Sequence, residues 1–154
     1  MQLNSSTTYA IDIMLHLAKN KGVTSSNALS QSVVVSRRYL MQIAGKLRNG
    51  EMIGVNRGMG GGYFLLKEPA HISVYDIIIL MEGRIRIIKD AEDVFVHHTL
   101  HEAFQDLQNI ITNYLGSLTL DVLLDKTWPQ CLEHLTDMME PYYEAARIKA
   151  AQKQ

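Results

Sequence analysis

The fold is decided by residues 53–66, Ile-Gly-Val-Asn-Arg-Gly-Met-Gly-Gly-Gly-Tyr-Phe-Leu-Leu. On both sides of the glycines, successive residues alternate at the two-residue period of a β-strand. The central glycines are too many for a tight two-residue turn, so the segment predicts a hairpin with an extended tip. A loop that cradles nucleotide phosphates is excluded, because such loops run from a strand into a helix.

Three helices are predicted before the hairpin, and a fourth directly after it. The first spans about 8–19 and is followed by basic residues and glycine, as helix C-termini prefer. A short helix is expected at 26–32, and Ser36 provides a hydroxyl suited to the N-cap of a third. Residues 73–76 resemble a capping box and begin a helix that ends near Gly83. This order predicts a winged helix-turn-helix.

The third helix carries polar side chains in its first turns, where a recognition helix enters the major groove. Arginine bonds guanine edges and glutamine bonds adenine edges, but both also bind phosphates, and the sequence does not separate the two roles. A solvent-facing helix in a three-helix domain is the alternative. The residues predicted to contact DNA from this helix are Ser36, Arg37, Arg38, Tyr39, Gln42 and Lys46.

The hairpin tip carries one cation among its glycines, which suits a narrow minor groove whose negative potential attracts arginine. A plain surface hairpin is the alternative. The residues predicted to contact DNA from this wing are Arg57, Gly58, Gly60 and Gly61.

The net charge of −1 conceals an uneven distribution along the chain. Residues 34–67 hold six basic side chains and one acidic side chain, whereas residues 68–140 hold four basic and thirteen acidic side chains. Such asymmetry indicates an electrostatic footprint in one region, although a solvated helix face gives the same pattern.

A long helix is predicted from about 97 to 115, with an apolar stripe wider than one partner needs. One edge is expected to pack on its own domain and the other on a second chain. The residues predicted to form the dimer contact are Leu100, Phe104, Leu107, Ile111 and Tyr114. The chain is thus expected to be mostly α with a small β-hairpin wing, divided into a winged helix-turn-helix domain at 1–83, a connecting segment at 84–96, dimerisation helices at 97–125 and a C-terminal helical tail at 126–154.

Several classes of protein are excluded. The sequence has no apolar run long enough for a membrane span and no signal peptide at its start, so a cytoplasmic location is expected. The single Cys131 rules out an intramolecular disulfide. No catalytic spacing stands out, so no enzymatic activity is expected. His97, His98 and His101 could chelate a metal ion, but histidines at a helix start are usually solvated, and a metal sensor is kept only as an alternative.

These motifs resemble the IscR-like (Rrf-two) family of winged helix-turn-helix regulators, over about residues 1–124. The resemblance implies a homodimer with crossed long helices that binds a near-palindromic DNA operator, most simply as a repressor. Some cluster-free members work through a metabolic enzyme, so a protein partner or an unknown effector is the second hypothesis. The resemblance is carried by Tyr9-Ala10, Ser36, Tyr39-Leu40, Gln42, Lys46-Leu47-Arg48, Gly50, the wing at 57–63, the following helix at 72–83 and the segment at 119–123.

The sequence departs from this family at four places. Members tend to carry basic residues just before the tyrosine of the first helix, where this chain has Ser6-Thr7-Thr8. Many members hold an iron–sulfur cluster through three cysteines before the long helix, but residues 84–96 contain none, so no cluster is expected as a cofactor. Met59 stands where the wing usually has proline, and Val34 stands where the turn usually has glycine.

Overall fold

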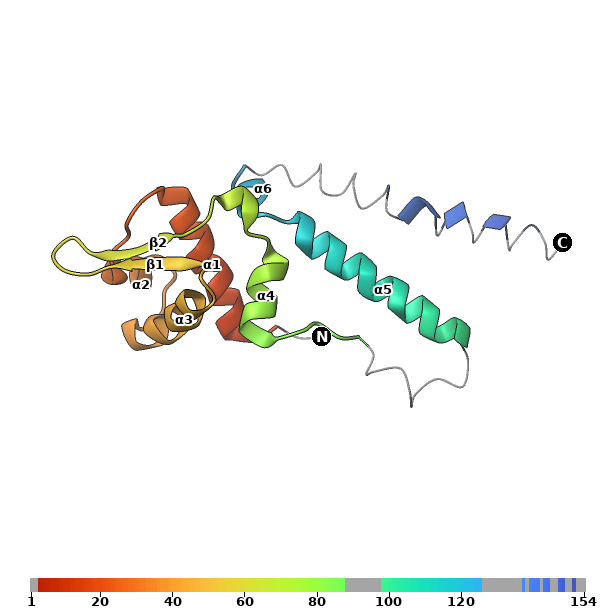
Figure 1. Cartoon of the computed structure of the whole chain (residues 1–154), viewed down its shortest axis with the longest axis horizontal. Coiled ribbons are helices and arrows are strands. Elements are labelled where there is room, and N and C mark those ends of the chain that lie inside the picture. Colours follow the sequence, from red (N-terminus) through yellow and green to blue (C-terminus); the bar gives the residue numbers. More distant parts are fainter. Residues whose placement is uncertain are drawn as a thin grey trace.

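The computed structural model describes residues 3–87, residues 98–125 and parts of 137–151. It confirms a mostly helical chain with one two-stranded antiparallel hairpin. In Figure 1 the hairpin projects at one end, and the long helix α5 extends from the other. The elements are α1 Ser5–Asn20, α2 Ser26–Ser32, α3 Arg37–Asn49, β1 Ile53–Asn56, β2 Gly62–Leu65, the 3-10 turn η1 Pro69–His71, α4 Val74–Glu82, α5 His98–Ser117 and α6 Leu120–Leu124.

One hydrophobic core holds the N-terminal domain together. It is filled by the inward faces of α1, α3 and α4, at the three- and four-residue spacing of amphipathic helices. α6 adds Leu120 to the same core and packs on α1, so this part of the predicted dimerisation segment belongs, within one chain, to the N-terminal body. Core residues with at most 2% exposure include Ile13, Met14, Leu17, Leu29, Leu40, Ile43, Leu47, Ile53, Ile72, Ile77 and Leu120.

α1 begins at Ser5, earlier than the sequence predicted. The backbone N–H of Asn4 and the hydroxyl of Thr7 both donate to Oε1 of Glu82, at 2.8 and 2.6 Å. These hydrogen bonds stabilise the carboxylate and hold the pKa of Glu82 below its usual value. They tie the start of α1 to the end of α4, and no local sequence signal reveals a partner so far along the chain.

The hairpin is anchored to the body by a third backbone segment. β1 pairs with β2 in the register Ile53↔Leu65 and Val55↔Tyr63, as the alternation predicted. Tyr63 also exchanges two backbone hydrogen bonds with Thr24, at 2.9 and 2.8 Å. The two backbones are so close that a Cβ on Gly62 would lie 2.1 Å from the carbonyl oxygen of Thr24. Glycine is therefore required at that position by space.

The turn between α2 and α3 has an unusual backbone. Val34 has a φ of 54° and is 84% exposed. A β-branched residue rarely adopts a positive φ, because its side chain crowds the backbone there. This strained residue occupies the turn position at which the resembled family usually has glycine.

α5 joins the N-terminal domain through a short backbone bridge at its C-terminal end. The amide of Val74 donates to the carbonyl of Leu118 at 2.8 Å, and the amide of Leu120 donates to the carbonyl of Ile72 at 3.0 Å. Leu118 also packs with Val74 and Ile78 in a small second core. Among the described residues, no helix combines the length and apolar composition needed to cross a membrane.

Candidate nucleic-acid interface

The start of α3 is built as the sequence predicted. The hydroxyl of Ser36 accepts a hydrogen bond from the amide of Tyr39 at 3.2 Å and so caps the helix. The side chains of Arg37, Arg38 and Gln42 are exposed on its first turns, and Lys46 is exposed one turn further on. The capped helix therefore presents a polar and cationic surface outside the core.

Tyr39 differs from these neighbours because its ring is engaged within the domain. It is half-buried and packs edge-on against Tyr9 of α1, with ring centroids 5.8 Å apart and an interplanar angle of 89°. Edge-to-face pairs of this kind contribute to packing beyond the area that they bury. The ring therefore fixes α3 against α1, and the DNA contact predicted for Tyr39 stays a prediction.

One arginine predicted to bind DNA from α3 and the arginine of the wing line the same hollow. Arg37 and Arg57 both line a depression of about 500 Å³ between the start of α2, the start of α3 and the hairpin. The glycines predicted as wing contacts, Gly58, Gly60 and Gly61, line it as well. The two elements thus form a continuous surface.

Sequence reasoning missed several residues of this surface. Ser25, Ser26 and Asn27, at the start of α2, line the same hollow. The hydroxyl of Ser25 caps α2 by accepting a hydrogen bond from the amide of Ala28 at 3.2 Å.

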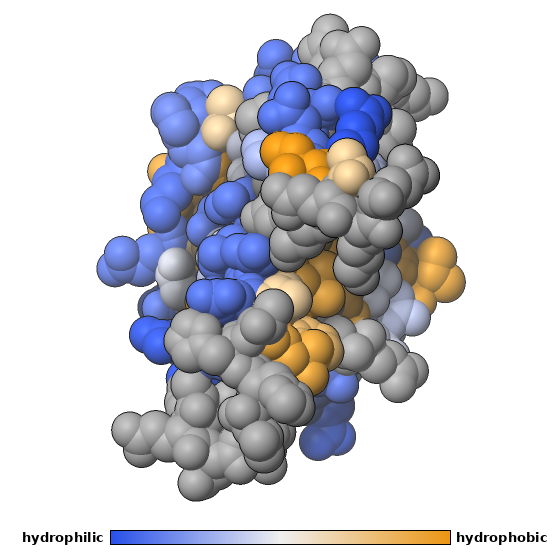
Figure 2. Space-filling view, turned by 90° about the vertical axis from the view of Figure 1, so that its right-hand side faces the viewer, coloured by the Kyte–Doolittle hydropathy of each residue, from blue (hydrophilic) through white to orange (hydrophobic). Residues whose placement is uncertain are grey.

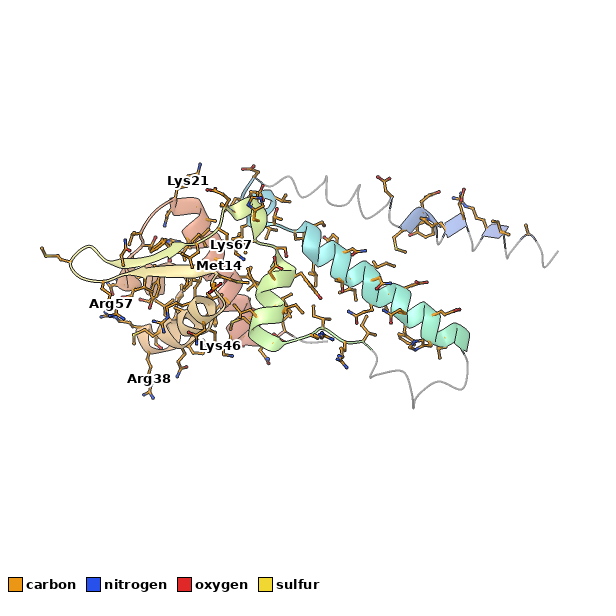
Figure 3. The ribbon with its side chains drawn as sticks, viewed as in Figure 1. Met14, Lys21, Arg38, Lys46, Arg57 and Lys67 are labelled. Carbon is orange, nitrogen blue, oxygen red and sulfur yellow. The ribbon has the colours of Figure 1, made fainter. Side chains whose placement is uncertain are left out.

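Three of the basic side chains lie on the side of the domain formed by α3 and the hairpin, and a fourth lies at the opposite edge. In Figure 3, Arg38 and Lys46 project from the α3 side, Arg57 projects from the nearby hairpin, and Lys21 projects at the opposite edge. The only acidic residue between 34 and 67 is Glu51, beyond the end of α3. Positive charge with little opposing charge attracts the phosphate backbone of DNA.

Residues 3–126 match the model of the Rrf2 family, which is described as an iron-dependent transcriptional regulator. The chain belongs to the Rrf2 family. It is therefore a DNA-binding transcriptional regulator with a winged helix-turn-helix, and its family is one of regulators and not of enzymes. The expectations for the family, the fold and the absence of enzymatic activity are confirmed by this match.

Three relatives show how far the similarity extends. An HTH-type transcriptional regulator of Neisseria meningitidis serogroup A is 33% identical over 82% of this chain and 89% of its own length. The solved structure of CymR, the global cysteine regulator of Bacillus subtilis, is 31% identical with a TM-score of 0.74 and covers 82% of this chain and 98% of its own. The regulator IscR of Pectobacterium carotovorum is 30% identical over 81% of this chain and 80% of its own.

The predicted histidine cluster lies mostly outside the described residues. His97 and the side chain of His98 lie outside the described residues, and His101 is half-buried on α5. Among the residues that are described, no three metal-ligating side chains gather in one place. The alternative of a histidine-bound metal sensor therefore stays a prediction.

Proposed function

We propose that this Rrf2-family protein is a cytoplasmic repressor that binds a near-palindromic operator as a homodimer and holds no iron–sulfur cluster. The observation that carries the proposal is the hollow lined by both Arg37 and Arg57. One element there suits the major groove and the other the minor groove, so a single domain can read two adjacent grooves of one duplex. Occupying the operator would exclude the transcription machinery from the same DNA.

The homodimer is supported by the surface of α5. None of the side chains of residues 100–117 is buried within the chain, although many are apolar. Leu100 is 46% exposed and Leu107 is 42% exposed. Figure 2, which looks at the side from which α5 extends, shows hydrophobic residues exposed among hydrophilic ones. A second α5 is the simplest cover for such a face, because like stripes are self-complementary about a two-fold axis.

The remaining predicted dimer residues differ in how far their own chain engages them. Phe104 and Ile111 are half-buried on α5. Tyr114 packs in the second core with Val74 and Ile78, so part of its ring already serves the N-terminal domain. The contact between two chains is therefore proposed to lie mainly on the part of α5 before Tyr114.

A single substitution on α3 tests the proposed mode of binding. Arg37→Ala should weaken binding to an operator selected from random DNA by about 1–3 kcal/mol if the arginine contacts a base, and should relax the preference at one base pair. If the arginine contacts a phosphate, its loss should instead weaken binding to all DNA sequences and reduce the dependence of the affinity on salt concentration. Fluorescence anisotropy at several salt concentrations measures both effects.

Lys67→Ala provides the matched control, because it removes the same charge from an exposed position at the base of the hairpin. It should cost less affinity than Arg37→Ala and leave every base preference unchanged. If the two variants bind alike and keep the parent's preferences, α3 is not the reading helix.

The family is described as iron-dependent. We nevertheless propose that this chain holds no iron–sulfur cluster, because it lacks the ligands that a cluster needs. A cluster usually takes four protein ligands, most often thiolates. The chain has one cysteine, Cys131, which lies outside the described residues, and none in the segment before α5. Even a dimer would supply only two thiolates, so the residues present do not fit the group.

Spectroscopy tests this proposal directly. Protein purified in air and protein reconstituted anaerobically with iron and sulfide should both lack visible cluster absorbance and bind the selected operator equally well. A stoichiometric cluster whose loss changes DNA affinity would contradict the proposal and leave the winged helix-turn-helix unaffected.

A further inference from the structure

The tip of the wing exposes a large apolar side chain to solvent. Met59 has a relative exposure of 108%, the highest among the exposed large hydrophobic residues that the structure describes. An isolated exposed apolar residue is ordinary on a protein surface, so exposure alone decides nothing. The role of the side chain depends on the turn that holds Met59 and on the nearby Arg57.

The backbone fixes Met59 at the apex of a closed turn. The amide of Gly61 donates to the carbonyl of Gly58 at 3.0 Å, which makes Met59 and Gly60 the two central residues of a four-residue turn. Gly60 has a φ of 80°, the value that the second central position of a type II turn requires. The hydrogen-bonded turn therefore holds Met59 outward at the end of the hairpin.

The same turn lies beside the cation proposed to enter the minor groove. Arg57 is exposed, precedes Met59 by two residues and lines the hollow shared with Arg37. Figure 1 shows the hairpin tip projecting beyond the helices of the domain. Met59 therefore lies at the exposed tip of the same hairpin, two residues from the arginine that is proposed to enter the minor groove.

We propose that Met59 is an apolar wedge that inserts between two base pairs from the minor groove and bends the operator. The inference rests on the proposed function, since it needs the wing to lie against the minor groove. Proteins that bend DNA from this groove use apolar side chains, methionine among them, to unstack one base step partly. Pyrimidine–purine steps such as TA open at the lowest cost, so the wedge adds a sequence preference without a hydrogen bond to any base.

Methionine suits this task on this scaffold. Its side chain is unbranched and flexible, so it adapts to the irregular gap between unstacked bases. The flanking glycines add no side chain that would keep the turn away from the groove. Because Met59 supports no other residue in its own domain, its replacement leaves the fold intact.

Two variants of the full chain test the wedge. Met59→Gln keeps the length of the side chain and makes it polar, whereas Met59→Leu keeps an apolar side chain. The probe is a duplex selected by the parent protein from a random pool and labelled at both ends for energy transfer. A second pair of duplexes carries either a TA step or a stiff A-tract at the position facing the wing.

The parent and Met59→Leu should shorten the distance between the duplex ends and prefer the TA duplex by about tenfold. Met59→Gln should still bind the selected duplex but leave it straighter and lose that preference. Bending and TA preference that are unchanged in Met59→Gln would overturn the wedge while Arg37→Ala and Arg57→Ala still weaken binding. Failure of the parent to select any duplex would instead overturn the proposed function.

Discussion

Replacing Gly62 by alanine should lower the free energy of unfolding by about 2–3 kcal/mol. The added Cβ would lie 2.1 Å from the carbonyl oxygen of Thr24 and 2.8 Å from the amide nitrogen of Ser25. Both are backbone atoms, which cannot rotate away as a side chain can. The hairpin would have to separate from residue 24, with loss of the two hydrogen bonds between Thr24 and Tyr63.

Gly45→Ala is the matched control for this substitution. A Cβ at Gly45 meets nothing within 4 Å, and the residue lies inside α3. Alanine should therefore raise stability by about 0.5–1 kcal/mol, since glycine is costly in a helix interior. Urea unfolding followed by circular dichroism measures both variants. Equal stability of Gly62→Ala and the parent would show that the wing is not anchored at residue 24.

Replacing Leu107 by aspartate should convert the proposed dimer into monomers and weaken binding to a two-half-site operator about 100-fold. Leu107 is 42% exposed within its own chain, so the change disturbs little of that chain's core. In a dimer the aspartate would be buried against a second apolar stripe, where an unpaired charge is costly. Affinity for a single half-site should stay that of one domain.

Asn109→Asp is the control for the dimer prediction. It adds the same charge at an exposed position outside the apolar stripe of α5. It also keeps the side-chain oxygen that accepts a hydrogen bond from Gln105. Sedimentation equilibrium should find this variant dimeric and Leu107→Asp monomeric. A dimer that survives Leu107→Asp would place the contact on another face of the chain.

Local patterns in the sequence sufficed for the helices, the hairpin and the cap of α3. The alternation on both sides of residues 57–62 and the hydroxyl of Ser36 act over a few residues only. The hairpin and the helix cap that they form can therefore be predicted without a structure. The same reasoning identified Arg37 and Arg57 as separate candidates for DNA contact.

Contacts between distant segments lay beyond such patterns. The hydrogen bond at the start of α1 joins Thr7 to Glu82, which is 75 residues further along the chain. The hollow combines three segments that are separate in the sequence, so neither its existence nor the place of Ser25 in it could be inferred. The burial of Leu120 in the N-terminal core likewise needs α6 to fold back on α1.

The backbone bridge at Leu118 attaches α5 to the N-terminal domain at one end, so that a rotation at this end is amplified at the other. Hydrogen bonds at Leu118 and Leu120 join the C-terminal end of the helix to the domain that carries α3 and the wing. With 20 residues, α5 is about 30 Å long, so a tilt of about 10° at its base displaces its far end by about 5 Å. A displacement of the far end is therefore expected to change the orientation of the domain that carries α3 and the wing.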